Sequence, residues 1–315
     1  MGLKIYATLL GYFRRFILLF RLGKYDRILL HREATPLGPP WWEWAARHIW
    51  RKRIVYDFDD AVWLSNNSAA NEKWVGAVKA HGKTARIISW SEQVTAGNQF
   101  LVGYARRHCP KVHHIPTTID TRHHHCGLKV HEHYELPELP LMGWTGSHST
   151  LKQLLPLFPF LEKLYEEQPF HFLLISDEAP ASMPPFMRFR KWSKEDEIKD
   201  LLEMDFGIMP LYDSDWERGK CGFKALQYMA LGMPAVASDV GVNAEIIEHG
   251  KQGFLAEAMP LKSEERWKEA CLALLRDAGL RRKMGTEARK RIVEHYSCEA
   301  WSERYLQVFS PGSKV

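Results

Sequence analysis

Residues 217–247 have the sequence ERGKCGFKALQYMALGMPAVASDVGVNAEII, and the architecture of the chain can be inferred outward from this segment. A loop with two glycines and two lysines, residues 219–224, precedes a helix that we predict over 223–231. A short apolar run at 235–238 predicts a buried strand. A turn of small residues at 239–243 then leads into a second helix. This order of helix, strand and helix is typical of an α/β fold.

The two junctions between loop and helix in this segment suggest an anion site. The first turn of a helix presents backbone N–H groups and the positive end of the helix dipole, and glycine lets a ligand come close. Because the two junctions lie one strand apart, a bound diphosphate is one interpretation, with Lys220 and Lys224 stabilising its charge. An ordinary βα unit, with its lysines in solvent, is the other interpretation.

Apolar runs of strand length alternate with helical patterns along the rest of the chain, which predicts parallel sheets. The predicted strands are 27–31, 53–58, 93–97, 112–115, 141–144, 170–175, 187–190 and 206–210. The predicted helices include 150–167, 194–203, one capped by Ser263, one capped by Ser297, and one with Trp74, Val78, His81, Ala85 and Ile88 on a single face. Since ligands bind beyond the carboxyl ends of parallel strands, polar residues after these strands are candidate site residues.

The opening segment also matches a known signature. The residues that stand where the signature has them are Met229, Ala230, Gly232, Pro234, Val236, Ala237, Ser238, Gly241 and Glu245. In this the chain resembles the retaining glycosyltransferases of the GT-B fold, especially the family 4 group. Further segments resemble other parts of these enzymes: His31–Pro40, Tyr56–Trp63, Ala96–Ala105, Ile115–Asp120 and Met142–Lys152. The resemblance covers nearly the whole chain.

The resemblance implies an α/β fold of two Rossmann-like, doubly wound parallel-sheet domains that face a cleft. We expect an acceptor-side domain over 1–138, a nucleotide-sugar-binding domain over 139–296, and a final helix over 297–315 that crosses back to the first domain. The strand and glycine-rich loop that usually begin such enzymes are not evident, so the first domain is expected to lack its initial βα unit. The implied donor is a UDP- or GDP-sugar, with no bound cofactor and no metal.

The chain departs from the family at two carboxylates that the family places eight positions apart. Gly219 and Gln227 hold those positions here. Gln227 can still hydrogen-bond a ribose hydroxyl, but Gly219 cannot replace a carboxylate, so Glu217 is the nearest candidate. The family also places an Arg and a Lys near the start of the second domain, and only Lys152 lies at a comparable position. We therefore assign Glu217, Lys220 and Lys224 to catalysis and Gln227 and Lys152 to donor binding.

Other donor-side candidates follow predicted strands or lie in the signature. They are Gly146, Ser147, Trp192, Gly219, Gly222, Ser238, Gly241, Val242, Asn243 and Glu245. Backbone N–H groups of Gly146 and Ser147 are expected to contact phosphate, and Trp192 to lie against the nucleobase. A tryptophan after a strand is as often part of the core.

Three carboxylates, Asp57, Asp59 and Asp60, follow a predicted buried strand, where they are costly unless paired or used. We predict that Asp59 or Asp60 accepts a hydrogen bond from a sugar or acceptor hydroxyl and so contributes to catalysis. A structural ion pair with Arg32 or Arg53 is the alternative.

The acceptor side has three further candidates: His31, Arg32 and Asn98, which follow predicted strands. His31 is a candidate base there. A buried histidine with satisfied hydrogen bonds is the alternative.

Composition limits the compartment and the function class. A chain of 315 residues suits two domains, and no apolar run approaches the ~18 residues of a membrane span. The first twenty residues lack a signal-peptide pattern, and the five cysteines form no C-x-x-C pair, so we expect a cytoplasmic protein. No nucleic-acid module is evident.

The net charge of +5 is mild, and the most basic region is the amino-terminal fifty residues or so. It contains Arg14, Arg15, Arg21, Arg47, Arg51, Lys52 and Arg53. This charge favours weak peripheral contact with anionic lipid at the inner face of the membrane, or with phosphate-bearing acceptors. A solvated basic face explains it equally well.

Nine of the fifteen histidines lie between His108 and His148. A cluster of this kind raises the possibility of a metal site, but its spacing matches no motif of known ligand geometry. Because the stretch falls where the family has its interdomain linker, we interpret it as a polar, solvated linker and predict no metal ligand.

Together these observations predict a glycosyltransferase that uses a nucleotide sugar and a glycan, a lipid-linked or a small-molecule acceptor, with retention of configuration. A non-catalytic GT-B protein that binds a nucleotide or a partner is the main alternative, supported by the missing βα unit and the missing glutamate. A UDP-sugar epimerase, which has the same fold, is a second alternative, although it would need carboxylates at the anomeric centre.

Overall fold

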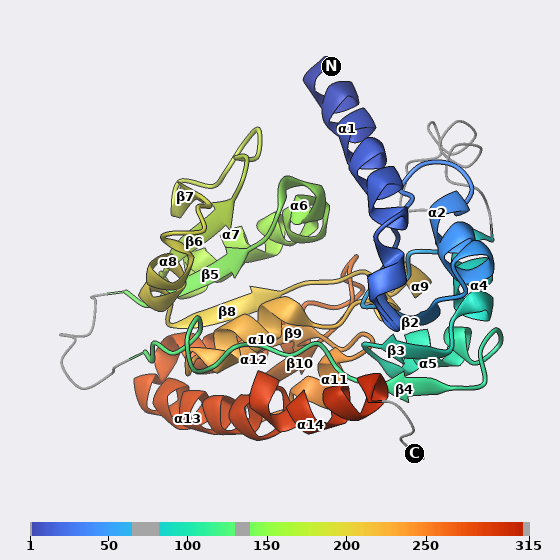
Figure 1. The fold of residues 1–315 in the computed structure, drawn as a ribbon. Coiled ribbons are helices and arrows are strands. Elements are labelled where there is room, and N and C mark those ends of the chain that lie inside the picture. Colours follow the sequence, from blue (N-terminus) through green and yellow to red (C-terminus); the bar gives the residue numbers. More distant parts are fainter. Residues whose placement is uncertain (1, 65–81, 130–138, 311–315) are drawn as a thin grey trace. The chain divides into compact units, whose positions relative to one another are not determined.

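The computed structural model describes residues 2–64, 82–129 and 139–310. The chain divides into two compact units, Met1–Pro116 with Arg304–Val315, and Thr117–Glu303 (Figure 1). The predicted domain boundaries, after residues 138 and 296, stay predictions. Residues 130–138 of the predicted linker and the first half of the helical pattern at 74–88 lie outside the described residues.

The first unit contains a parallel sheet of four strands in the order β1-β2-β3-β4. The strands are β1 (Arg27–His31), β2 (Arg53–Phe58), β3 (Gln93–Ala96) and β4 (Val112–His114), which confirms the four predicted strands to within one residue. All four are parallel, so their carboxyl ends lie at one edge of the sheet. His31 pairs in register with Asp57, which places both side chains at that edge.

The helices of this unit precede its first strand or connect its strands. They are α1 (Gly2–Leu19), η1 (Leu22–Lys24), α2 (Trp41–Trp44), the π-helix η2 (Ala45–Ile49), α4 (Lys83–Trp90) and α5 (Gln99–Ala105). The final helix, α14 (Cys298–Phe309), begins in the second unit, and its residues from Arg304 onward belong to the first. The Arg27 guanidinium donates to the carbonyl of Phe309 at 2.6 Å, which fastens this helix end to β1. No helix among the described residues is both long enough and apolar enough to span a bilayer.

The second unit contains a parallel sheet of six strands in the order β10-β9-β8-β5-β6-β7. The strands are β5 (Leu141–Thr145), β6 (His171–Ser176), β7 (Met187–Lys191), β8 (Phe206–Met209), β9 (Ala235–Ser238) and β10 (Gly253–Ala256). The strand order reverses at β5, between β6 and β8. In doubly wound sheets such a switch point opens a crevice at the carboxyl edge, where ligands bind.

Helices cover both faces of this sheet (Figure 1). They are α6 (His148–Leu154), η3 (Leu155–Leu157), α7 (Phe158–Glu167), α8 (Glu197–Glu203), α9 (Asp215–Arg218), α10 (Phe223–Ala230), α11 (Asn243–Ile246), α12 (Glu265–Arg276) and α13 (Ala278–His295). On β6, Leu173 packs in one core with α10 and α13, whereas Phe172 and Leu174 pack in another with α7 and α12. Alternate side chains of a strand point to opposite faces, so the sheet lies between two apolar layers.

Three expectations about helices need correction. The predicted helix 150–167 is two helices separated by the 3-10 turn η3, because Pro156 and Pro159 lack the N–H groups that a continuous helix would need. The helix predicted from residue 194 begins at Glu197, because the hydroxyl of Ser193 accepts from the Asp196 N–H and holds a turn there. Ser263 accepts from Glu265 N at 3.3 Å, yet the N-cap position of α12 is Glu264.

Candidate functional site

The junction between the lysine loop and α10 requires glycine at position 222. Gly222 precedes α10 with φ of 69°, a conformation that residues with a Cβ rarely adopt. A Cβ there would lie 2.3 Å from Cδ1 of Ile246 on α11, whose side chain is fully buried. Gly222 therefore lets α10 and α11 approach closely, which brings the two predicted loop-to-helix junctions together.

Both predicted phosphate lysines lie at this junction. Nζ of Lys220 is 3.9 Å from Oε1 of Glu217, and its side chain is only 17% exposed. Nζ of Lys224 lies 5.5 Å from the ring centroid of Trp144, at the end of β5. Both lysines have further interactions. The two positive charges therefore stand beside the first turn of α10, where the sequence predicts a diphosphate.

Glu217 is held in a network of hydrogen bonds. The carboxylate is buried on α9, Nε2 of Gln153 donates to its Oε1 at 3.2 Å, and the hydroxyl of Ser214 donates to its Oε2. Gly219, which stands at the family's first carboxylate position, is the C-cap of α9. Glu217 thus fixes the start of the lysine loop, and its second role, contact with the donor sugar, stays a prediction.

Gln227 lies one turn into α10 and is buried, with its Nε2 donating to Oε1 of Glu197 at 3.2 Å. Nε1 of Trp192 donates to the same oxygen at 3.1 Å. Trp192 is 42% exposed, so it is not the core tryptophan that the alternative interpretation required. Burial opposes ionisation of Glu197, but hydrogen bonds from Trp192, His124 and Gln227 bring its pKa below the ordinary value. Sequence reasoning missed Glu197, which no motif marks.

The turn after β9 is fixed by its own polar side chains. The Ser238 hydroxyl accepts from Leu211 N at 2.9 Å and donates to the Glu257 carbonyl at 3.1 Å. Nδ2 of Asn243 donates to the Ser238 carbonyl at 2.9 Å. Oδ1 of Asn243 is buried and has no hydrogen-bond partner among the described residues. Of this turn, Asn243 therefore has an acceptor oxygen to offer to a ligand, whereas the Ser238 hydroxyl is already used.

The other predicted residues of this turn have structural contacts. Gly241 has φ of 56°, and a Cβ there would lie 3.1 Å from the Arg218 backbone. Val242 is buried as the N-cap residue of α11. The side chain of Glu245 is exposed, and its carbonyl accepts from Arg291 and Tyr296. These contacts keep the turn close to α9 and α13.

The loop after β5 differs from the expectation at one position. The Gly146 N–H donates to the Ile175 carbonyl at 3.0 Å, so the fold already uses the group that was predicted to contact phosphate. Ser147 is the N-cap residue of α6, and its hydroxyl lies 2.8 Å from that of Ser149. Lys152 is exposed on α6, and its carbonyl accepts from the Tyr212 hydroxyl at 3.3 Å. The phosphate contact from Gly146 was wrong, because strand pairing with β6 extends one residue beyond β5.

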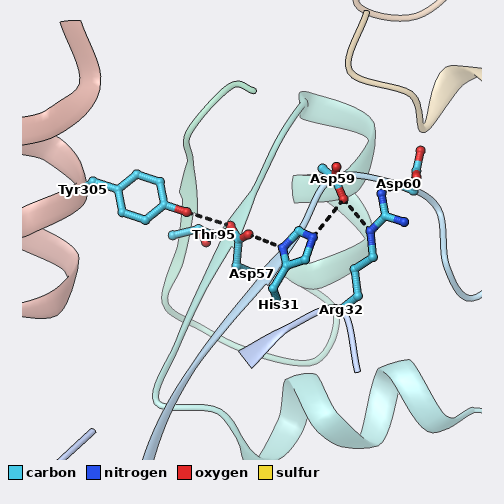
Figure 2. Close-up of polar contacts among 7 residues, drawn as sticks. All are labelled: His31, Arg32, Asp57, Asp59, Asp60, Thr95 and Tyr305. Atoms are coloured by element: carbon cyan, nitrogen blue, oxygen red, sulfur yellow. Dashed lines mark hydrogen bonds and ion pairs between the residues drawn. The ribbon is translucent and has the colours of Figure 1, made fainter. Parts of the chain in front are cut away.

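The first unit brings most of its predicted acceptor-side residues together at the carboxyl edge of its sheet (Figure 2). Nδ1 of His31 lies 2.7 Å from Oδ2 of Asp57, and its Nε2 lies 3.8 Å from Oδ1 of Asp59. The His31 side chain is 53% exposed, so it is not a buried structural histidine. An imidazole held through Nδ1 by a carboxylate has the orientation of a general base, and the Nε2 of His31 faces Asp59.

Asp57 is the centre of this cluster. Its Oδ1 accepts from the hydroxyl of Thr95 on β3 and, at 3.2 Å, from the hydroxyl of Tyr305 on α14 (Figure 2). Burial, and then the nearby charge of Asp57, raise the pKa of Tyr305 to about 12, so its hydroxyl stays protonated and donates. Neither Thr95 nor Tyr305 was predicted. Only the apolar face of the last helix draws attention to Tyr305 in the sequence.

Arg32 forms ion pairs with Asp59 and Asp60, which was the alternative to their predicted contact with a sugar or acceptor hydroxyl. Its Nε donates to Oδ1 of Asp59 at 2.7 Å and its Nη2 to Oδ2 of Asp60 at 2.6 Å (Figure 2). The hydrogen bond to Asp59, opposed by burial, raises the pKa of the Arg32 guanidinium. Asn98 is buried, and its Oδ1 accepts from Leu101 N at 2.9 Å as the cap of α5. The carboxylates are thus neutralised, while Arg32 remains 41% exposed in its side chain.

The interpretation of the histidine-rich stretch as a solvated linker was wrong for two of the described histidines, because His113 on β4 and His125 are both buried. His125 is only 3% exposed. Nη1 of Arg289, on α13, donates to its carbonyl at 2.8 Å, and the His125 N–H donates to the Asp120 carbonyl at 2.8 Å. These contacts fold the stretch onto the second unit. His131 and His133 lie outside the described residues.

Comparison with known proteins finds a similarity in the second unit of the chain. Residues 187–291 match the family model described as Glycosyl transferases group 1. The chain is therefore similar to this family over about a third of its length. The matched residues contain the lysine loop, α10 and the turn after β9, and thus most of the donor-side candidates. The matched segment is therefore the part of the molecule in which the sequence predicts the nucleotide site.

One curated relative and two solved structures extend the comparison. N-acetyl-alpha-D-glucosaminyl L-malate synthase of Bacillus anthracis is 30% identical over 116 residues, which cover 37% of this chain and 29% of that protein. Sucrose-phosphate synthase of Thermosynechococcus elongatus superposes with a TM-score of 0.69 at 16% identity, covering 91% of this chain and 73% of that one. Anabaena HepE in complex with UDP and glucose superposes with a TM-score of 0.68 at 13% identity, covering 94% of this chain and 81% of that one.

These structural likenesses show the fold. The chain is an α/β protein with two parallel sheets, as in its GT-B neighbours, which confirms the predicted fold class. The match to the curated relative spans less than a third of that protein.

Proposed function

We propose that this chain is a retaining glycosyltransferase that moves a sugar from a UDP- or GDP-sugar to a glycan, a lipid-linked or a small-molecule acceptor. One observation carries the proposal: the junction at Gly222, with Lys220 and Lys224 beside it, lies inside the segment that matches Glycosyl transferases group 1. The neighbour HepE was solved with UDP and glucose, which supports a UDP-sugar as the donor.

The chemistry assigns distinct work to the lysines. As the bond between the anomeric carbon and the diphosphate oxygen breaks, negative charge develops on the diphosphate. Lys220, Lys224 and the N–H groups at the start of α10 would stabilise that charge. The acceptor oxygen bonds to the anomeric carbon on the same face, and its proton passes to the departing diphosphate. The protein then supplies positioning and charge stabilisation.

The residues around Gln227 are proposed to hold the nucleoside. Glu197 fixes both the Gln227 amide and the Trp192 indole through one oxygen, so the two predicted donor residues are positioned together. The half-exposed Trp192 ring offers a face to a base, and the buried Oδ1 of Asn243 offers an acceptor. In the first unit, His31, oriented by Asp57, is proposed to contact the acceptor, with Arg32 beside it.

Incubation with a panel of UDP- and GDP-sugars, with release of free nucleotide measured by chromatography, tests the proposal. Release that depends on an added acceptor, and that Lys220→Ala with Lys224→Ala abolishes, is the expected result. The anomeric configuration of the product, read by NMR, decides retention. Binding of nucleotide without release would favour the non-catalytic alternative. Interconversion of the nucleotide sugar without release would favour the epimerase.

The first unit is also proposed to contact anionic lipid weakly. The helix α1 exposes Phe13 at 60% and Phe16 at 50%, next to Arg14 and Arg15. Exposed aromatic rings beside arginines are typical of helices that lie in a membrane interface. Sedimentation with vesicles, with and without phosphatidylglycerol, should show binding to the anionic vesicles that Phe13→Ser with Phe16→Ser reduces. Equal binding by the matched control Tyr25→Ser and by that double variant would contradict it.

A further inference from the structure

A cluster of two imidazoles and one carboxylate lies in the second unit, beside the residues proposed to hold the donor. It consists of His124, His125 and Glu197, and one ligand atom from each lies within 4.8 Å of the others. Nε2 of His124 is 3.1 Å from Oε2 of Glu197. The His124 and His125 rings lie edge to face, with their centroids 4.7 Å apart. Side chains distant in the sequence thus converge on one point.

His125 is the observation that an ordinary ion pair does not explain. Its side chain is buried, and neither Nδ1 nor Nε2 has a hydrogen-bond partner within the described residues. A buried polar atom without a partner costs free energy, so such an atom normally has a ligand, an ion or a water against it. A neutral imidazole has a lone pair on one of its ring nitrogens, and no hydrogen bond within the described residues uses that lone pair in His125.

We propose that His124, His125 and Glu197 bind one Zn²⁺ ion. Two imidazole nitrogens and a carboxylate oxygen are a donor set that zinc uses in proteins, with a fourth position left for water or another ligand. Ligand atoms about 2.0–2.1 Å from a tetrahedral ion lie roughly 3.3 Å apart, a separation that His124 and Glu197 already have. The ligand atoms of the three side chains now lie up to 4.8 Å apart, roughly 1.5 Å more than a tetrahedral ion requires. Rotation of the imidazole rings would shorten this distance.

The backbone around the cluster is fixed in advance. Nη1 of Arg289 donates to the His125 carbonyl and Nη2 to the Thr121 carbonyl, each at 2.8 Å. Oδ1 of Asp120 accepts from the N–H groups of Arg122 and His123 at 2.9 Å. Little conformational entropy remains to be lost when an ion binds, which favours affinity.

The cluster shares one carboxylate with the predicted donor residues. Oε2 of Glu197 faces His124, while Oε1 accepts from Trp192 and Gln227. An ion on Oε2 leaves both of these hydrogen bonds in place and orients the carboxylate that makes them. The site does not depend on the proposed transferase activity, because it needs no nucleotide.

Calorimetric titration of the chelator-treated full chain with Zn²⁺ tests the proposal, with Co²⁺ absorption as a second readout of coordination. We expect one ion per chain. His124→Ala and Glu197→Gln should each weaken binding about tenfold or more, since even residues that only orient a ligand contribute ~10–100-fold. Both are mild changes, because His124 is exposed and Gln is isosteric with Glu.

The control is His123→Ala, whose exposed ring lies in the same stretch but outside the cluster. It should bind Zn²⁺ as the unaltered chain does. Equal affinity in all variants, equal loss in His123→Ala, or no one-to-one binding would overturn the proposal and leave water as the partner of His125.

Discussion

Replacement of Gly222 by alanine tests the geometry of the lysine-loop junction. The alanine would have to keep the backbone φ of 69°. Its Cβ would lie 2.3 Å from Cδ1 of Ile246, a side chain that is fully buried and cannot turn into solvent. The left-handed conformation costs about 1–2 kcal/mol for a residue with a Cβ. Overpacking of a full core adds about 1–3 kcal/mol. We therefore expect Gly222→Ala to lower the free energy of unfolding by about 2–5 kcal/mol.

A matched control separates the two contributions. Gly250 has φ of 82°, but a Cβ there would meet nothing within 4 Å, so Gly250→Ala should cost only the ~1–2 kcal/mol of backbone strain. Ile246→Val removes Cδ1 and should cost ~0.5–1.5 kcal/mol alone. Combined with Gly222→Ala, it should relieve the clash, so the double variant should be more stable than the two separate costs predict.

The assay is unfolding in urea followed by hydrogen exchange of peptides from residues 223–238. It reports the second unit directly, because two units need not unfold together. Calorimetry with UDP on the same variants should show weaker binding for Gly222→Ala than for Gly250→Ala. If both alanine variants lose the same stability, or if Ile246→Val brings no relief, the close approach of α10 and α11 is not what requires glycine.

Three further predictions concern the proposed site. Lys220→Ala with Lys224→Ala should weaken UDP binding in calorimetry by ~1.5–3 kcal/mol for each lost charged contact while leaving uridine binding unchanged; equal loss for both ligands would contradict the phosphate assignment. Gln227→Leu should weaken UDP-sugar binding roughly tenfold or more. Gln227→Glu should also weaken that binding, because two carboxylates would meet, and Glu197→Gln in the same chain should restore it. Asp57→Asn should reduce transfer with UDP affinity unchanged, since it removes the carboxylate that orients His31; an unchanged rate would remove His31 from the acceptor side.

The strands were predictable because each is a short apolar run, and burial of such runs is the largest favourable contribution to the fold. All nine predicted strands are present, six of them with one or both ends shifted by one residue. The strand β10 was missed because four residues that begin with Gly253 carry little signal. The helix α13 was missed because it buries only a narrow stripe, Met284, Ala288 and Ile292, among many charged side chains.

The candidate site was predictable only in part. The polar residues after each strand could be named, because the carboxyl edge of a parallel sheet collects them. Their partners could not. Tyr305 reaches Asp57 across 248 positions of sequence, and Gln227 reaches Glu197 across 30, so both contacts depend on how complete helices pack. The burial of His125 likewise depends on Arg289, 164 positions away, and no local pattern records it.

The departure from the family signature at Gln227 has a physical explanation in these contacts. The signature has a carboxylate at that position of α10, and here Glu197 on α8 presents one to the Gln227 amide at 3.2 Å. A carboxylate on α10 itself would add negative charge near the proposed diphosphate site. The Gln227 amide, hydrogen-bonded to the Glu197 carboxylate on a neighbouring helix, can still bind a hydroxyl. The negative charge then belongs to Glu197, one side chain farther from the proposed diphosphate site. Glutamine at position 227 is therefore compatible with the proposed donor binding, and the carboxylate to test is Glu197.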